Sequence, residues 1–423
     1  MSAPVVSQLR LPVELLDIVI DFLQADWRTL AVCALVGPDW ASRALKHLSS
    51  PNGITLTLHS PECGEADDLA HMTTSGSLLA NTIRGLTIQG SSGDVSDYPP
   101  FPQSLAILGH LSGLRSLTLR LFLVQDAEHL VSVILASSSL EDLNVESLSL
   151  DVTSSASRAL AARIFVMAPR VVVLPRLVSL RVTDHKDAMS GLLFEVLAAY
   201  LNAVANPTFL RFLSIHADPR HGGTPADPDI ELWYLLITGA HSTLTHLSLT
   251  LPAPMDSFAG EIDCARFTRS FICCPHLRCL TLRYLPPNVA SEQHARFIGA
   301  FQRFFRVTAH AKPAFAAALE QLAVVVPHSA IRANLAEVAE QCVLLGPLLN
   351  SDAYPALSAV TIGVYHESCN QVDVWLDAEV QDGMKRLKSA LYALEERGVS
   401  VQVKAMEPVD WEHWPSSLRT TDA

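Results

Sequence analysis

The sequence predicts an α/β solenoid, a stack of strand–loop–helix units that follows a short helical segment at the N-terminus. Three observations predict it: a leucine pattern recurs along the chain, its copies lie about 34 residues apart, and stretches with helical spacing separate them. Self-similarity at a period of roughly 20 to 50 residues is typical of solenoids, in which each repeat packs only on its neighbours.

The recurring pattern is Leu-x-x-Leu-x-Leu, with apolar substitutions. Full copies begin at Leu114, Leu140, Leu177, Leu210, Leu244, Leu277, Leu319 and Leu357, and an earlier copy begins at Ile83. The stretch 54–58 looks like a degenerate first copy, with Leu56 taken as its fourth position. The second half of each copy alternates apolar and polar side chains, which is typical of a half-buried strand.

Helical spacing of apolar residues marks the segments between these strands, at 127–135, 192–204, 230–237, 267–272 and 331–345. Units of this length cannot bury their apolar faces alone, and stacking gives them one shared core. We therefore expect the strands to line a concave parallel sheet and the helices to form the convex side. An ordinary doubly wound α/β domain with leucine-rich strands is the alternative.

The repeated pattern resembles the leucine-rich repeat family, in particular its longer and irregular members. The asparagine or cysteine that this family carries a few residues after the strand is mostly missing. Leu148 follows Val145 without it, and Arg283 and Tyr284 occupy the place in another copy. The resemblance implies a solenoid with irregular repeats.

The N-terminal residues carry a separate apolar pattern. A helix start is expected at Leu11, with Pro12 in the first turn and Glu14 near the positive end of the helix. A short apolar segment follows at 30–36, then a turn, then a third helical stretch from Trp40. The first helix carries a wide apolar stripe, made of Leu15, Leu16, Ile18, Val19, Phe22 and Leu23.

This segment resembles the F-box, on Leu11, Pro12, Glu14, Leu15, Ile18, Leu23, Leu30, Cys33, Leu35, Val36 and Trp40. It departs from the family at 37–39, where cysteine and basic residues are common. The resemblance implies docking onto the Skp-type adaptor of a cullin–RING ubiquitin ligase. It implies an adaptor-binding set of Leu11, Pro12, Leu15, Ile18, Leu35, Val36 and Trp40. Alternatively, these helices only cap the open end of the solenoid.

The expected organisation is an F-box-like segment at 1–50, a leucine-rich-repeat-like solenoid at 51–405 and a C-terminal tail at 406–423. Irregular, insertion-rich repeats and frequent alanine, leucine and proline resemble the large F-box families of mushroom-forming fungi. The predicted function is that of a substrate-recognition subunit of an SCF-type ligase, in which other subunits transfer ubiquitin. The alternative is an adaptor-independent interaction scaffold or inhibitor.

Strand side chains that flank the buried leucines are expected on the concave face, where a target protein would bind. Long or titratable side chains can pair with a partner's groups, and aromatic ones add contact area. The predicted target-binding residues are Arg120, Glu146, Arg181, His216, Arg283, Tyr284 and Tyr365. Polar rows of this kind also fit any solvent-facing strand, and the inserted loops at 91–102 and 217–229 are alternative recognition points.

Net charge, cysteine content and the length of apolar runs limit the partners and the compartment that the sequence predicts. A net charge of -13 repels phosphate backbones and anionic lipid, so neither nucleic acid nor membrane is an expected partner. No signal peptide precedes the eight cysteines, which predicts reduced thiols in a cytosolic or nuclear protein. No uncharged apolar run is long enough to predict a membrane span.

No catalytic motif is evident in the sequence: the glycine-rich phosphate loop, the dinucleotide fingerprint and the nucleophile elbow are all absent. Cys273, Cys274, His276 and Cys279 lie close together, but their spacing fits buried thiols better than a closed zinc site. We therefore expect no enzyme activity, no cofactor and no metal site, and an unrecognised enzyme is the remote alternative.

Overall fold

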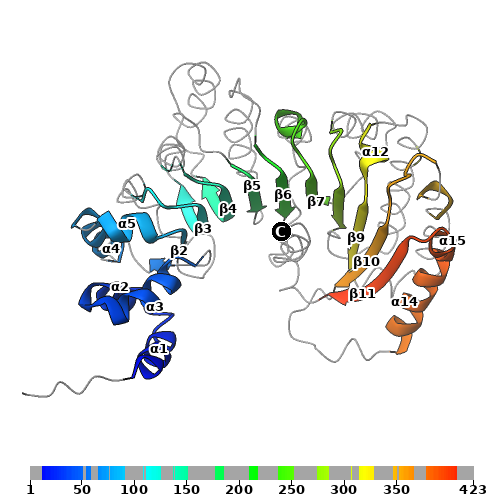
Figure 1. Ribbon diagram of the computed structural model, residues 1–423. Coiled ribbons are helices and arrows are strands. Elements are labelled where there is room, and N and C mark those ends of the chain that lie inside the picture. The colour runs from blue at the N-terminus through cyan, green and yellow to red at the C-terminus, as the bar shows by residue number, and fades with distance from the viewer. Residues whose placement is uncertain are drawn as a thin grey trace, which may run out of the picture. The chain divides into compact units, whose positions relative to one another are not determined.

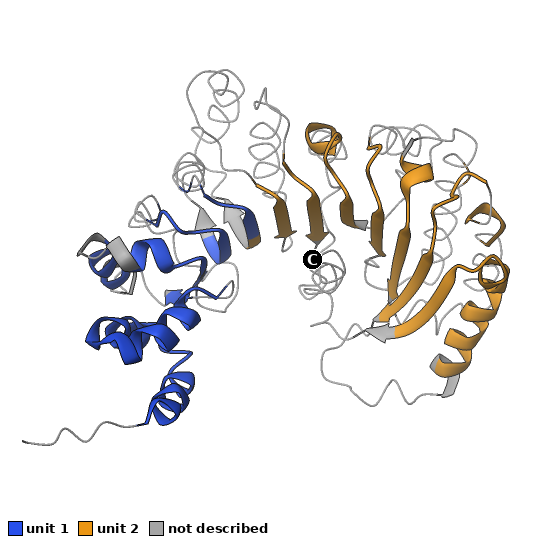
Figure 2. Cartoon of the chain, in the orientation of Figure 1, with its two compact units in different colours: residues 1–144, 173–175 blue, residues 145–172, 176–423 orange. Residues whose placement is uncertain are grey.

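The computed structural model describes residues 12–50, 54–58, 65–75, 77–90, 108, 111–124, 137, 139–150, 177–184, 209–217, 237–251, 274–284, 306, 314–327, 346–349, 352–365 and 378–406. The chain divides into two compact units (Figure 2). The first comprises residues 1–144 and 173–175, and the second comprises residues 145–172 and 176–423.

Three helices open the first unit: α1 (Val13–Phe22), α2 (Trp27–Val36) and α3 (Pro38–Leu48). α1 begins at Val13, later than the helix start expected at Leu11, and Pro12 is its N-cap and not a residue of its first turn. Asp26 caps α2, because the backbone N–H and the hydroxyl of Thr29 donate to its carboxylate at 3.1 and 2.6 Å. These hydrogen bonds lower the pKa of Asp26 below its ordinary 3.8. The cap makes α2 begin earlier than the expected apolar segment.

The strands of the first unit are β1 (Ile54–Leu58), β2 (Gly85–Gly90) and β3 (Ser116–Val124), with α4 (Glu65–Ser75) and α5 (Ser77–Thr82) between β1 and β2. β1 pairs in parallel with β2, and β2 with β3. β4 (Asp142–Leu150) runs across the boundary of the two units.

The register corrects one sequence assignment. Ile54, and not Leu56, is the partner of Leu86, and Leu56 pairs with Ile88. The alternation in 54–58 fits either register, so the pattern alone did not separate the two choices.

The second unit contains β5 (Ser179–Asp184), β6 (Phe212–Ala217), β7 (His246–Leu251), β8 (Cys279–Tyr284), β9 (Gln321–Pro327), β10 (Ala359–Tyr365) and β11 (Ser400–Met406). Each pairs in parallel with the next, so spatial order follows chain order (Figure 1). The described helices are α12 (Ala314–Ala318), α14 (Ala378–Ala390) and α15 (Tyr392–Glu396), and the last two contact β11.

The predicted α/β solenoid is therefore confirmed, with a strand at every copy of the leucine pattern. Parallel strands in strict chain order exclude the doubly wound alternative, whose strand order reverses at a switch point. The described residues do not include the helical stretches expected at 127–135, 192–204, 267–272 and 331–345. Of the stretch expected at 230–237, only Ile237 is described.

One row of apolar side chains forms the core along the sheet of the second unit. The fourth residue of each copy is aligned with the fourth residue of the next, and every one of them is at most 5% exposed. The row reads Leu180, Leu213, Leu247, Leu280, Leu322 and Val360, and Val401 of β11, which follows the last copy, continues it. Shared burial of this kind explains why repeats are stable only when stacked.

A backbone carbonyl accepts two N–H groups at most junctions between repeats. The carbonyl of Arg84 accepts from Arg115 and Ser116 at 2.8 and 2.9 Å. In the second unit the carbonyl of Arg211 accepts from Thr245 and His246 at 3.0 and 2.9 Å. The same geometry recurs at the carbonyls of Arg115, Val178, Thr245, Arg278 and Glu320. These bonds align each strand with the one before it, independently of side chains.

A backbone irregularity shifts the alternation in β3. Leu121 has φ of 60°, in the left-handed region that non-glycine residues seldom adopt. Leu117 and Leu119 are fully buried before it, and Phe122, instead of Leu121, is fully buried after it. The irregularity therefore directs the large ring of Phe122 into the core, as a β-bulge does.

Candidate functional site

Exposed apolar side chains gather on the first two helices. Of the ten large apolar side chains that are exposed in the described residues, eight lie on α1 and α2 and two, Phe209 and Tyr392, lie elsewhere. The eight, which we call the exposed apolar set, are Val13, Leu15, Ile18, Val19, Phe22, Val32, Leu35 and Val36. Such a concentration is uncommon on a protein that works alone and is typical of an interaction surface.

α1 is apolar on two faces. Leu15, Ile18, Val19 and Phe22 follow the spacing of one helical stripe, and Phe22 is 84% exposed. Ile20 belongs to the inner face and is fully buried. The outer apolar stripe of α1 needs a cover of its own, and within the described structure only the side of α1 that carries Ile20 is buried.

α2 repeats the arrangement. Val32, Leu35 and Val36 form a second outward stripe, and the last two are each 65% exposed. The inner face of α2 is formed by Trp27, Leu30, Ala31, Cys33 and Ala34, all of which are buried. The inner faces of both helices therefore satisfy the packing of the segment, and the outer faces contribute nothing to it.

An ion pair joins α1 to α3. Arg43 donates from Nε and Nη2 to the carboxylate oxygens of Asp21, and His47 Nε2 lies 2.7 Å from Asp21 Oδ1. The hydrogen bond from Arg43, followed by that of His47, holds the pKa of the Asp21 carboxyl well below its ordinary 3.8. Asp21 also raises the pKa of the Arg43 guanidinium. This pair fixes how α1 presents its outer stripe.

The residues predicted to bind an adaptor lie as follows. Leu15, Ile18, Leu35 and Val36 belong to the exposed apolar set, Pro12 is exposed before α1, Trp40 is partly exposed on α3, and Leu11 lies outside the described residues. The prediction omitted Val13, Val19, Phe22 and Val32. Phe22 could have been found, because it lies two helical turns after Leu15 on the same stripe.

A second candidate site, which is polar, lies on the sheet of the second unit. Adjacent strands place Arg181, Ser214, Ser248 and Thr281 in one row across β5 to β8. The neighbouring row contains Thr183, His216, Thr250 and Arg283 in the same strands. Three hydroxyl side chains of the first row are at most 7% exposed, so this face of the sheet is covered where β6 to β8 run.

His216 lies at the centre of these two rows. Its Nε2 makes a short hydrogen bond with Ser214 Oγ and lies 3.5 Å from Ser248 Oγ. Burial, and then the positive charges of Arg283 and Arg181, lower the pKa of His216 well below its ordinary 6.5. The imidazole is therefore neutral at physiological pH, and both guanidinium groups are close enough to act on it.

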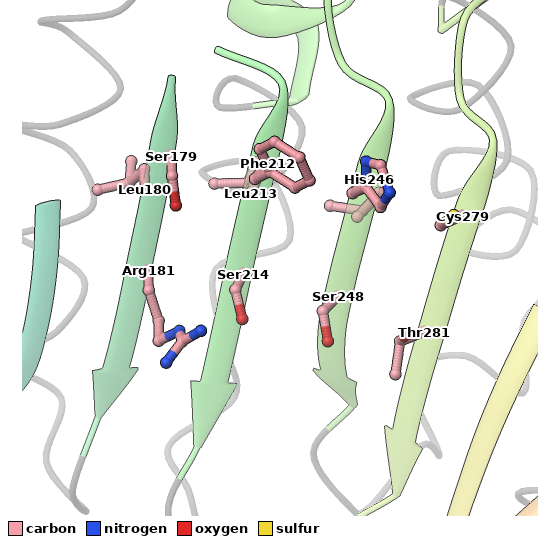
Figure 3. A pocket seen from close by; sticks show the side chains of 11 residues that line it. Ser179, Leu180, Arg181, Phe212, Leu213, Ser214, His246, Ser248, Cys279 and Thr281 are labelled. Carbon is pink, nitrogen blue, oxygen red and sulfur yellow. The ribbon is translucent and has the colours of Figure 1, made fainter. Parts of the chain in front are cut away.

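A hollow opens over the strand starts of this face (Figure 3). The hollow is partly open to solvent. Arg181 extends from β5 towards the Ser214 side of the hollow. At the other end, the rings of Phe212 and His246 stack with their centres 4.4 Å apart. The lining is completed by Ser179, Leu180, Leu213, Leu247, Ser248, Cys279 and Thr281.

The structure brings together three of the residues predicted to bind a target: Arg181, His216 and Arg283. His216 is 8% and Arg283 is 6% exposed, so both are more enclosed than the open concave face that the sequence indicated. Of the other predicted residues, Arg120 on β3 and Glu146 on β4 are partly exposed, and Tyr284 and Tyr365 end β8 and β10. Target binding by these residues stays a prediction.

The cysteine cluster provides no metal site within the described residues. Cys274 and Cys279 are buried free thiols, His276 is exposed, and Cys273 lies outside the described ranges. Among the described helices, none combines the length and hydropathy needed to cross a bilayer.

Comparison with known proteins identifies no family. No family model matches the chain, and no curated protein matches it either. Among solved structures, an internalin from Listeria monocytogenes is similar at 10% identity, over 94% of this chain and 98% of that chain, with a TM-score of 0.27. A TM-score this low carries no inference, so the solenoid rests on the strand register described above.

Proposed function

We propose that the chain is the substrate-recognition subunit of an SCF-type cullin–RING ubiquitin ligase, active in the cytosol or nucleus. In this proposal the N-terminal segment 1–50 is an F-box that binds a Skp-type adaptor. The solenoid, residues 51–405, binds the target protein, and residues 406–423 form a tail. The observation that carries the proposal is the exposed apolar set on α1 and α2.

The energetics of the outer stripes support a permanent or frequent partner. Covering one large apolar side chain stabilises a complex by roughly 1.5–3 kcal/mol relative to leaving it in water. Several such side chains on α1 and α2, both of which contact α3, give a partner a few dominant apolar anchors. Phe22, at 84% exposure, has the most to gain from a partner.

The choice of a Skp-type adaptor rests on the residues of the F-box resemblance. Leu15, Ile18, Leu35 and Val36 were assigned to the adaptor from their order in the chain, and each has its side chain in solvent at 48% exposure or more. A segment that only capped the solenoid would gain nothing from keeping these side chains in water.

The remaining steps of the mechanism follow from proximity. A chain that holds an adaptor with one segment and a target with another raises the effective concentration of target lysines near the ubiquitin-charged enzyme. The receptor then needs no catalytic residues of its own. The sheet face of the second unit that carries Arg181, His216 and Arg283 is the proposed target side, and Arg120, Glu146, Tyr284 and Tyr365 are further proposed target contacts.

Binding to a purified Skp-type adaptor tests the proposal. We expect the wild-type chain to co-elute with the adaptor and the Leu15→Asp, Leu35→Asp double variant to lose at least 100-fold in affinity. The matched control is the Phe209→Asp, Tyr392→Asp double variant, which adds the same charge at the exposed apolar positions outside the set. This control should bind like the wild type.

Two results would contradict the proposal. If the wild-type chain does not bind the adaptor, the adaptor-independent scaffold replaces it. If the variant of the exposed apolar set still binds while the control does not, the docking face is elsewhere. Circular dichroism of all three proteins separates these results from unfolding.

A further inference from the structure

One position of the repeat carries exposed charged side chains at several junctions. It is the position whose backbone carbonyl accepts two N–H groups from the next repeat. At two junctions an arginine there pairs with a glutamate at the same position of the following repeat. Arg115 Nη1 lies 3.4 Å from Glu141 Oε1, and Arg278 Nε lies 3.6 Å from Glu320 Oε1. The spacing of stacked repeats therefore lets an arginine and a carboxylate on neighbouring levels form an ion pair across the surface.

Arg211 occupies the same position without such a partner. Its N–H donates to the carbonyl of Val178 at 2.8 Å, and the N–H of Thr245 donates to its own carbonyl at 3.0 Å, so these two uncharged residues are its neighbours in the row. No described residue forms a hydrogen bond or an ion pair with the exposed guanidinium of Arg211. Arg211 is thus placed like Arg115 and Arg278, but its charge is available to a group from another molecule.

An exposed aromatic ring lies two residues before this arginine. Phe209 is 51% exposed, and among the described residues it is one of two exposed large apolar side chains outside α1 and α2. Leu210, between Phe209 and Arg211, is fully buried, so both flanking side chains face away from the core just before β6 begins. Arginine and aromatic residues are the side chains that most often dominate binding at protein interfaces. The two together offer a partner an apolar contact beside a cation.

We propose that this edge of the solenoid binds an extended acidic segment of a target protein. A carboxylate of the segment pairs with Arg211 as Glu320 pairs with Arg278, and an apolar side chain two residues away covers the ring of Phe209. An extended chain places alternate side chains on one side, which matches the spacing of these two groups. A free anion would use the guanidinium and leave the ring in water. The proposal does not rest on adaptor docking, since no residue of α1 to α3 takes part.

A short peptide with this pattern tests the proposal on the full chain. The peptide acetyl-Ser-Glu-Ser-Leu-Ser-amide is titrated, and saturation-transfer NMR follows its leucine methyl groups. We expect saturable binding, weakened about two- to five-fold in Arg211→Gln, the range for one exposed ion pair. A peptide with glutamine in place of glutamate should lose a similar factor, and Phe209→Ala should also weaken binding. The matched control is Arg84→Gln, which should bind like the wild type. Arg84 is exposed at the same repeat position and no described residue pairs with it, but Thr82 stands where the ring would be.

Thr245→Glu gives a second test that does not remove the arginine. It supplies within the chain the carboxylate that the proposal assigns to the target, at the position that Glu320 has relative to Arg278. We expect this variant to fold and to lose peptide binding, because Arg211 is then already paired. Thr245→Gln is the matched control. It loses the same threonine hydroxyl and adds a side chain of the same length without the charge, so it should bind like the wild type.

Four results would overturn the proposal: no saturable binding to the wild type, equal binding of the glutamate and glutamine peptides, wild-type affinity in a folded Arg211→Gln or Thr245→Glu, or an equal loss in Arg84→Gln. Sodium acetate at the concentration of the peptide should not displace it. Displacement by acetate would assign Arg211 to free anions and would also overturn the proposal. Adaptor binding measured on the same proteins should be unchanged, which separates this test from that of the proposed function.

Discussion

Arg43 on α3 donates two hydrogen bonds to Asp21 on α1, from Nε to Oδ1 at 2.7 Å and from Nη2 to Oδ2 at 2.5 Å. The bidentate geometry fixes both the distance and the rotation of α1. Since the outer stripe of α1 is part of the exposed apolar set, this pair sets the direction in which Leu15, Ile18 and Phe22 point. A polar contact inside the segment therefore governs an apolar surface on its outside.

Breaking the pair should loosen α1 without unfolding the solenoid. We expect Asp21→Asn and Arg43→Gln each to lower the thermal midpoint of the helical segment and to weaken adaptor binding. The double variant should be little worse than either single one, because both changes remove the same interaction. Calorimetry on all four proteins measures the coupling, and additive effects would show that the two residues act independently.

Acid should release α1 in a defined pH range. The pKa of Asp21 is lowered in the folded chain, so its stabilising contribution is complete above the ordinary value of 3.8 and is lost as the pH falls below it. We expect adaptor affinity to be flat from neutral pH to about pH 5 and to fall steeply below pH 4. In Asp21→Asn this fall should be reduced, as binding measured across the range would show.

His216 predicts a second acid effect at higher pH, in the other unit. Its pKa is lowered by burial and by Arg283 and Arg181. Below about pH 6.5 the histidine therefore binds a proton in the unfolded chain but stays neutral in the folded chain. The free energy of unfolding should therefore decrease as the pH falls from 7 to 5. Urea unfolding of His216→Gln should show a smaller decrease over this range, and an unchanged slope would contradict the burial of a neutral imidazole.

Gly113 is expected to tolerate no side chain. A Cβ there would lie 2.2 Å from the carbonyl oxygen of Asn81, and that oxygen belongs to the backbone and cannot rotate away. We expect Gly113→Ala to destabilise the first unit by about 1–3 kcal/mol or more, the cost of overpacking. Gly37→Ala is the control, because no atom lies within 4 Å of its added Cβ, and its effect on chemical unfolding should stay within about 0.5 kcal/mol.

Substitution by alanine should lower stability at Leu282 and leave it nearly unchanged at Leu35. Leu282 on β8 is fully buried, and Leu282→Ala should cost about 2–5 kcal/mol of unfolding free energy because it leaves a cavity. Leu35 is 65% exposed, and Leu35→Ala should change stability by less than about 0.5 kcal/mol while it weakens adaptor binding. A large stability loss at Leu35 would show that α2 packs differently.

The strands were predictable because each carries its own signal. The alternation around Leu213, Leu247 or Leu280 is local, and a spacing near 34 residues places every copy. The register of β1 could not be predicted, because Ile54, Leu56 and Leu58 fit two alignments with β2. The apolar residue that begins every other copy of the pattern is missing here, so nothing decides between the two. Pattern alone decides a register only where one alignment exposes the leucines to water.

The candidate sites were predictable only in part, for a related reason. Periodicity shows that α1 is apolar on two faces, but it does not show which face the neighbouring helix covers. Phe22 was omitted because the adaptor-binding set was taken from the F-box resemblance, although its spacing places it on the stripe of Leu15. Alternation likewise places His216 and Arg283 opposite the leucine row, yet what covers that face depends on residues distant in the sequence. Both limits arise because burial is a property of the whole fold.

The carbonyl that accepts two N–H groups belongs to an arginine at four junctions, Arg84, Arg115, Arg211 and Arg278, and to Val178, Thr245 and Glu320 at three others. Alignment is thus inherited from main-chain atoms that every residue possesses. Evolution is free to change the side chain at this position, and to lengthen the segments between strands, without moving any strand out of line. A protein built this way can acquire new recognition loops by insertion while its framework stays the same.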